Sequence, residues 1–138
     1  MRNKVCEYYN DTYESTTYLV IGTSRFAKKW MIENIHIDDN DVWETIESKA
    51  HAGCAFEFTN ADGSVFCNVI YMLELVASPS SLSTLYHEIF HVCCNIMLGR
   101  NIPVERDNNE AMAYILSAMS KYFLENTHVL RNQKKGKK

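Results

Sequence analysis

The sequence lacks an apolar run long enough to cross a membrane. A spanning helix needs about 20 consecutive, predominantly apolar residues. The two most apolar stretches, residues 65–76 and 82–98, are interrupted by polar side chains, among them Asn68 and His87. The N-terminus also lacks the continuous apolar segment and the small-residue cleavage site of a secretory signal. We therefore expect a cytoplasmic protein with no membrane partner.

Basic residues are scarce outside the C-terminus. The chain carries 14 Lys and Arg against 17 Asp and Glu, and five of the basic residues lie in residues 131–138. Nine basic side chains then remain against 17 acidic ones in the rest of the chain. Such an acidic body repels a phosphate backbone, which argues against nucleic acid as a partner. We expect a single domain over residues 1–130, followed by a basic, mobile tail at 131–138.

A disulfide framework is also missing. The five cysteines are odd in number, and none of them stands in a Cys-x-x-Cys spacing. In a chain without a secretory signal, this pattern predicts reduced and mostly buried thiols.

What the sequence does contain is an alternation of strand-like and helix-like segments. One strand-like segment is rich in β-branched and aromatic residues, and Asp62–Gly63 is a strong turn signal between two apolar runs. The predicted elements are a strand at 16–21, helices at 25–34 and 39–50, a hairpin of 53–58 and 64–73, and helices at 82–98 and 108–125. This order predicts an α+β domain in which a small antiparallel sheet packs on helices.

The segment His87-Glu88-Ile89-Phe90-His91 is an HExxH motif inside the helix predicted at 82–98. At about 100° per residue, four residues overshoot one helical turn by only about 40°, so both imidazoles project from one side and can bind the same ion. Apolar residues cover the rest of this helix, which makes two imidazoles and a carboxylate costly to bury without a purpose. The alternative is a pair of core or surface histidines at helical spacing with an unrelated Glu between them.

A zinc site with three protein ligands and an open position needs a third donor from elsewhere in the chain. One class of HExxH proteins uses a His six residues after the second His, with a Gly midway, but those positions hold Met97 and Cys94. Another class uses a Glu from a later helix. Glu110 stands nineteen residues after His91, in the helix predicted at 108–125, and is the expected third ligand.

The assignment of Glu110 leaves alternatives open. With Asp107 as N-cap, Glu110 occupies the N3 position of a capping box, which is a purely structural role. Glu105, Asp107 and Glu125 are weaker substitutes for it as a metal ligand.

These residues resemble the gluzincin type of zinc metallopeptidase, in which HExxH is followed by a Glu on a later helix. The stretch Glu110-Ala-Met-Ala-Tyr114 is similar to the third-ligand helix of small ImmA/IrrE-type and phage-encoded metallopeptidases. The resemblance covers residues 64–125. It implies a minimal zincin-like domain of phage or mobile-element origin, with Zn²⁺ as its cofactor.

The ligand set predicts the chemistry of the site. Zinc held by two neutral imidazoles and one carboxylate keeps about one positive charge, which lowers the pKa of a bound water towards about 7 and polarises a scissile carbonyl. Glu88 is the expected general base, which takes the water proton and passes it to the leaving amine. Tyr114, one turn beyond Glu110, is the candidate oxyanion donor, with core packing as its alternative role. The strand at 64–73 is the expected edge on which an extended peptide pairs by β-augmentation.

The function that these observations favour is hydrolysis of peptide bonds in a protein or peptide substrate by a zinc metallopeptidase. One alternative is a catalytically idle, zinc-stabilised domain that binds a protein partner, although an intact Glu88 has no use in a purely structural site. Another alternative is a zinc hydrolase that acts on a non-peptide amide. The sequence leaves the oligomeric state open.

Overall fold

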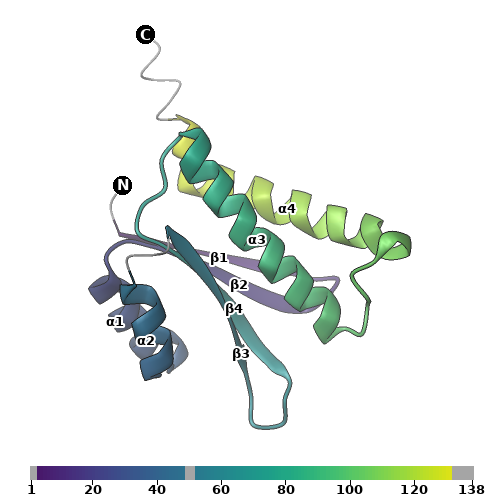
Figure 1. The fold of residues 1–138 in the computed structure, drawn as a ribbon, viewed down its shortest axis with the longest axis horizontal. Helices are drawn as coiled ribbons and strands as arrows, with labels where there is room; N and C mark the ends of the chain where they lie inside the picture. The colour runs from purple at the N-terminus through teal and green to yellow at the C-terminus, as the bar shows by residue number, and fades with distance from the viewer. Residues whose placement is uncertain (1–2, 49–51, 132–138) are drawn as a thin grey trace.

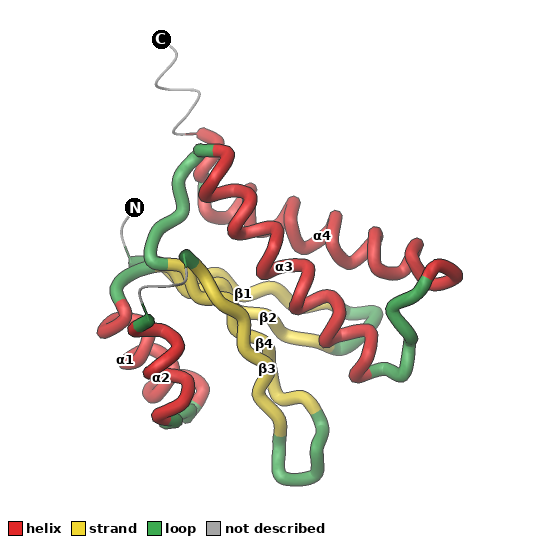
Figure 2. Tube along the Cα trace, viewed as in Figure 1, coloured by secondary structure: helices red, strands yellow, loops and turns green. Residues whose placement is uncertain are grey.

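The computed structural model describes residues 3–48 and 52–131 and places them in a four-stranded mixed sheet packed against helices, an α+β fold (Figures 1 and 2). The elements are β1 (Lys4–Asn10), β2 (Ser15–Ile21), α1 (Ser24–Ile35), α2 (Asn40–Glu47), β3 (Gly53–Thr59), β4 (Val65–Met72), α3 (Pro79–Gly99), the short 3-10 helix η1 (Arg106–Asn108) and α4 (Asn109–Thr127). The predicted tail after residue 131 and the last residues of the helix predicted at 39–50 lie outside the described residues. Among the described helices, none is both long and apolar enough to cross a bilayer.

The sheet is mixed, which corrects the prediction of an antiparallel sheet. Its strand order is β1-β2-β4-β3, with an antiparallel pair at each edge and a parallel pair, β2 and β4, in the middle. Parallel strands need a crossover connection, and helices α1 and α2 occupy the connection that follows β2. Both helices are predicted from the sequence, but the parallel pairing that they make possible is not.

Strand β1 is not among the elements that the sequence predicts. Lys4 and Glu7 are charged, and within the strand Cys6 and Asn10 are the buried residues. The segment therefore shows little of the hydrophobic alternation that is typical of a half-buried strand. It pairs antiparallel with β2 along its whole length. The strand is therefore recognised by its pairing with the buried strand β2 and not by its own composition.

The predicted hairpin and helices are confirmed. β3 and β4 pair antiparallel, and the backbone N–H of Asn60 donates to the carbonyl of Ser64 across their loop at 2.8 Å. Gly63 adopts a positive φ of 86°, which favours glycine. The observed helices differ from the predicted ones by three residues or fewer at their ends.

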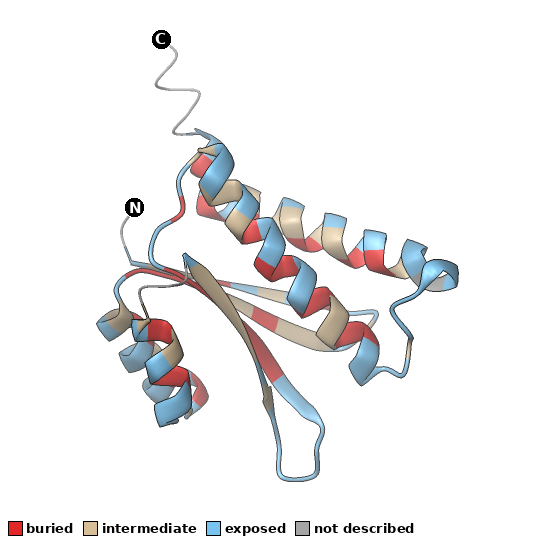
Figure 3. Ribbon diagram, viewed as in Figure 1, coloured by how far each residue is buried: buried red, intermediate tan, exposed pale blue. Residues whose placement is uncertain are grey.

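Helices cover both faces of the sheet, with α1 and α2 on one face and α3 and α4 on the other (Figure 1). The side chains of β4 alternate between the two faces of the sheet. Ile70 and Met72 pack with α3 and α4, whereas Val69 and Tyr71 pack with α1 and α2. Figure 3 shows buried residues on the sheet and on the inner sides of the helices. We call these two layers of core the α3/α4 half and the α1/α2 half.

Helix α3 runs alongside β3 and the start of β4. A Cβ atom built on Gly53 of β3 would lie only 3.0 Å from Cγ2 of Thr84, and one built on Gly99 would lie 3.6 Å from Cγ2 of Val65. The absence of a side chain at Gly53 thus allows the helix to approach the strand closely. This contact holds the HExxH motif, one turn beyond Thr84, beside β3.

Candidate functional site

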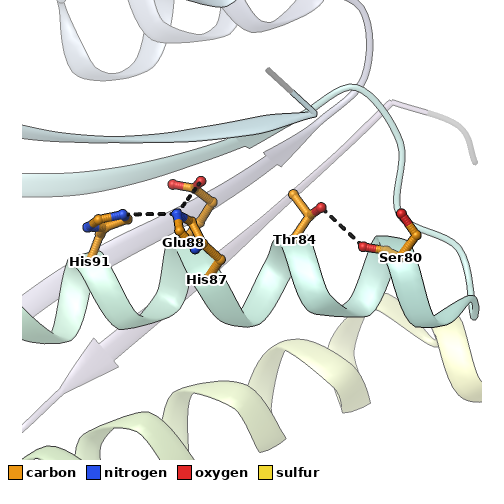
Figure 4. Close-up of polar contacts among 5 residues, drawn as sticks. All are labelled: Ser80, Thr84, His87, Glu88 and His91. Carbon is orange, nitrogen blue, oxygen red and sulfur yellow. Dashed lines mark hydrogen bonds and ion pairs between the residues drawn. The ribbon is translucent and has the colours of Figure 1, made fainter. Parts of the chain in front are cut away.

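The two histidines of the HExxH motif converge on an exposed side of α3. The Nε2 atoms of His87 and His91 lie 3.1 Å apart, and their ring planes are inclined at 77° to each other. Figure 4 shows both rings beside Glu88, on the side of the helix that points away from α4. The His87 side chain is 67% exposed. The prediction that both imidazoles project from one side of the helix is confirmed.

The separation of the two ring nitrogens fits a shared metal ion. Two nitrogens bound at about 2.0–2.1 Å to one tetrahedral zinc lie about 3.3 Å apart. The distance between His87 Nε2 and His91 Nε2 is 3.1 Å. In the absence of a cation, this distance suits a hydrogen bond from one neutral ring to the other. The rings therefore need little movement to bind a cation.

Glu88 is buried although it carries a carboxylate. The residue is 7% exposed, and its Oε1 atom lies 4.0 Å from Nε2 of His87. Its position, about 100° around the helix from His87, turns it toward the sheet. Burial, and then the negative charge of Glu88, raise the pKa of the Cys54 thiol in β3 to about 12. The buried carboxylate therefore lies close enough to β3 for its charge to act on Cys54.

The structure does not bring Glu110 to the histidines. Glu110 is exposed in the first turn of α4. This turn lies beside Met97 of α3, because Met97 lines the same small cavity as Asn109 and Met112 of α4. Met97 lies six residues beyond His91, which is about 9 Å along a helix. Across residues 3–48 and 52–131, no three His, Cys, Asp or Glu side chains are placed to hold a metal ion together. This holds for the substitutes Glu105, Asp107 and Glu125 as well.

Tyr114 also lies away from the motif. Its side chain is 63% exposed, so it does not pack in the core, which was the alternative role. Burial raises the pKa of Tyr8 in β1, and nearby Tyr114 adds to the rise. β1 and β3 are the opposite edges of the sheet. Helix α4 packs on the β1 side, whereas the motif lies on the β3 side, and this separates Glu110 and Tyr114 from the histidines.

The edge strand beside the motif is β3, not the strand predicted at 64–73. That strand, β4, pairs with β2 on one side and with β3 on the other. Its long apolar run is typical of a strand that is buried on both faces, and such strands lie in the middle of a sheet. β3 pairs with β4 and with no other described strand. Its outer N–H and C=O groups can therefore pair with an added strand.

All five cysteines are unpaired, as predicted. Burial raises the pKa of Cys67 to about 12, and burial together with its neighbour Cys94 does the same for Cys93. A thiol with such a pKa stays protonated and is neither a good nucleophile nor a good metal ligand at neutral pH.

A group of polar residues one turn beyond the motif is missing from the sequence-based site. Asn95 follows His91 by four residues, and its Nδ2 donates to Oδ1 of Asn68 in β4 at 3.4 Å. Asn68 is 1% exposed. The sequence signal for this group is Asn68 itself, a single polar residue inside the apolar strand β4.

Comparisons of the chain with protein-family models, with curated proteins and with solved structures gave no match. Function is therefore inferred from the residues of this chain and their geometry.

Proposed function

We propose that the protein is a zinc-dependent metallopeptidase that hydrolyses peptide bonds of a protein substrate through a metal-activated water. The observation that carries the proposal is the convergence of the His87 and His91 Nε2 atoms, 3.1 Å apart, beside buried Glu88. A purely structural zinc site has no need for a carboxylate between its histidines. Burial of that carboxylate is costly, which supports a role for it in chemistry.

Each residue of the motif has a distinct role in this proposal. His87 and His91 supply two neutral nitrogens that would be two of the three protein ligands of Zn²⁺; the described residues do not place a third ligand beside them. When bound, zinc lowers the pKa of a water molecule and polarises a carbonyl group. The Glu88 carboxylate accepts the proton of the attacking water and donates it to the nitrogen of the leaving amine. Its burial against β3 limits the orientations that this carboxylate can adopt.

The outer edge of β3 is where this proposal places the substrate. α3 approaches β3 at Gly53 and Thr84, so a peptide that adds to β3 in an extended conformation runs alongside His87 and His91. Main-chain hydrogen bonds to the edge strand hold such a peptide whatever its sequence, and side-chain contacts add specificity. β3 takes the role that was predicted for the strand at 64–73.

The ligands of the proposed site differ from the sequence-based set. Because Glu110 lies at the start of α4, beyond the level of the motif, we expect zinc binding to depend on the two histidines far more than on Glu110. We likewise give no catalytic role to Tyr114, which is exposed near β1.

A catalytically idle, zinc-stabilised protein-binding domain is the second candidate function. The observation that favours it is the open edge of β3, since strand addition needs no catalysis. Buried Glu88 is the feature that this candidate does not explain.

Metal analysis of the purified full chain tests the proposed site. After loading with Zn²⁺ and dialysis, inductively coupled plasma mass spectrometry should find one zinc per wild-type chain and little zinc in His87→Ala or His91→Ala. The matched control is His36→Asn, because His36 is exposed at the end of α1 with φ of 57°, a conformation that Asn tolerates. This control should keep its zinc. Unchanged zinc in both motif variants would overturn the metal site.

Proteolysis is measured on the same preparations. A library of proteome-derived peptides is incubated with each protein, and new termini are identified by mass spectrometry. Cleavage by wild type and by His36→Asn, but not by His87→Ala, supports the peptidase. Bound zinc without cleavage of any peptide would favour the second candidate function.

A further inference from the structure

A cavity of about 200 Å³ lies under the C-terminal turns of α3. It is enclosed by this helix, by the first residues of β2 and β4, and by the turn that joins β1 and β2. Asn68, Asn95 and Arg100 are part of its lining, whereas His87, Glu88 and His91 are not. A cavity needs only about 15 Å³ to hold one water molecule. This space is large enough for a side chain, and it is separate from the proposed metal site.

Asn68 in the lining, and its neighbour Thr17 just outside the lining, each have a buried polar atom without a hydrogen-bond partner among the described residues. Asn68 lines the cavity, is 1% exposed, and its Nδ2 has no partner among the described residues. Thr17 stands opposite Asn68 in the β2–β4 pair, is fully buried, and its Oγ1 has no partner in that same set. An unsatisfied buried group costs about 1–3 kcal/mol. Of these two groups, Asn68 is the one that the cavity reaches, so it is the group that a ligand in the cavity could satisfy.

Packing does not explain why Asn68 is polar. On the same side of β4, Ile70 and Met72 are apolar and fully buried in the α3/α4 half, so an apolar residue would continue their pattern. Asn95 of α3 donates to Oδ1 of Asn68 at 3.4 Å. This contact occupies the oxygen of Asn68, whereas its buried Nδ2 has no hydrogen-bond partner among the described residues.

The available donors and the local charge define the ligand. Asn68 Nδ2 is a hydrogen-bond donor, so its partner in a ligand must be an acceptor such as an oxygen atom. An anionic ligand is disfavoured because the chain is acidic and Glu14 is itself in the lining. The guanidinium of Arg100 is already engaged, since it donates to the backbone carbonyls of Tyr13 and Glu14. Apolar side chains in the lining, among them Phe66, can contact methylene groups.

We propose that this cavity binds the neutral carboxamide end of a Gln or Asn side chain of a bound peptide or protein. The carboxamide oxygen accepts a hydrogen bond from Asn68 Nδ2, and the methylene groups lie against Val65 and Phe66, which are 39% and 47% exposed. This binding does not depend on a metal ion or on hydrolysis.

Titration of the isotope-labelled full chain with three capped amino acids tests the proposal. The probes are N-acetylglutamine methylamide and its glutamate and methionine analogues, which have similar lengths but differ in charge and polarity. The glutamine probe should shift the side-chain amide signals of Asn68 and Asn95 and bind about tenfold more tightly, or better, than either analogue. Treatment with a chelator should leave its affinity unchanged, so the result is independent of the proposed peptidase.

The variant Asn68→Leu gives a second readout. It should lose the preference for the glutamine probe. It removes an unsatisfied buried donor but also the acceptor of the Asn95 Nδ2 hydrogen bond, so its melting temperature should change little. Asn126→Ala, an exposed change on α4, is the matched control and should bind as wild type does. Equal binding of the glutamine and methionine probes, tighter binding of the glutamate probe, or wild-type binding by Asn68→Leu would each overturn the proposal. If Asn68→Leu does not fold, the ranking of the probes on wild type decides.

Discussion

The two halves of the core differ in how they treat polar groups. In the α1/α2 half, the buried residues are apolar or aromatic. All five buried Asn, Thr and Glu residues of the described chain belong to the α3/α4 half. The three in strands lie on the sheet face that α3 and α4 cover, because they alternate in phase with strand residues of that core, and the other two lie on α3 and α4 themselves. They are Asn10, Thr17, Asn68, Glu88 and Thr127. A core that needs only stability avoids such residues. The difference suggests that one half supports the fold and the other also carries chemistry.

Two of these five residues have an ordinary structural role. Oδ1 of Asn10 accepts a hydrogen bond from the backbone N–H of Tyr13, which closes the turn after β1. The Thr127 hydroxyl donates to the carbonyl of Phe123 at the end of α4. Thr17 Oγ1 and Asn68 Nδ2 have no hydrogen-bond partner among the described residues, and Glu88 is buried beside His87. The two proposals rest on Glu88 and Asn68.

The largest expected effect comes from removing the proton acceptor of the α3/α4 half. Glu88→Gln keeps the size and hydrogen-bonding capacity of the side chain, so zinc should stay bound while peptide cleavage falls by about 10²-fold or more. Cleavage rates and zinc content are measured on the same samples. Undiminished cleavage by the zinc-loaded variant would refute the role of Glu88 as base. In an idle binding domain, the same change would leave partner affinity almost unchanged.

Truncation of the α1/α2 core should affect stability alone. Met31 is fully buried in α1, and Met31→Ala should lower the free energy of unfolding by about 2–5 kcal/mol in urea titrations. Zinc content and cleavage by the folded fraction should not change. Met119→Ala, an equally buried position in α4, is the matched variant of the other half. Loss of zinc from folded Met31→Ala would show that the two halves are not independent.

High pH should weaken both halves in the same way. Burial raises the pKa of Cys67 in the α1/α2 half to about 12, and burial, with a smaller effect of Cys94, raises that of Cys93 in the α3/α4 half to about 12, from 9.0. Because the folded pKa lies above the unfolded one, the stabilisation is complete below pH 9.0 and is lost as the pH rises toward 12.

Urea unfolding at a series of pH values measures this loss. Cys67→Ala and Cys93→Ala should each reduce the dependence of stability on pH above 9.0. A stability that stays level through this range would mean that the thiols are not buried as the structure places them.

The smallest expected effect is at the predicted third ligand. Glu110→Ala should leave the zinc content unchanged, because α4 places this residue beyond the end of the motif. The measurement is the metal analysis used for His87→Ala, with both variants run together. A loss of zinc that equals the loss in His87→Ala would restore Glu110 as a ligand and require α4 to adopt a different position.

The outcome for the motif shows what local patterns predict well. The side on which His87 and His91 project depends on the helical repeat within a few residues, and the apolar residues of α3 predict that repeat directly. The hairpin is similar, because the Asp62–Gly63 turn and the two flanking runs are adjacent in the chain. The distance of Glu110 and Tyr114 from the histidines depends instead on how α4 packs on α3, and no local sequence pattern specifies this packing.

The sequence by itself determined the fold class, the helices, the hairpin and the pair of histidines on one side of α3, since each depends on residues close together in the chain. Only the tertiary structure decided that β1 completes the sheet, that β3 is its open edge, and that Thr17 lies beside Asn68. Among the described residues, Thr17 Oγ1 and Asn68 Nδ2 have no hydrogen-bond partner there. The tertiary structure also decided that α4 lies on the β1 side, away from the motif. These features depend on which strands and helices meet across long stretches of chain, and that choice follows from the burial of all elements together.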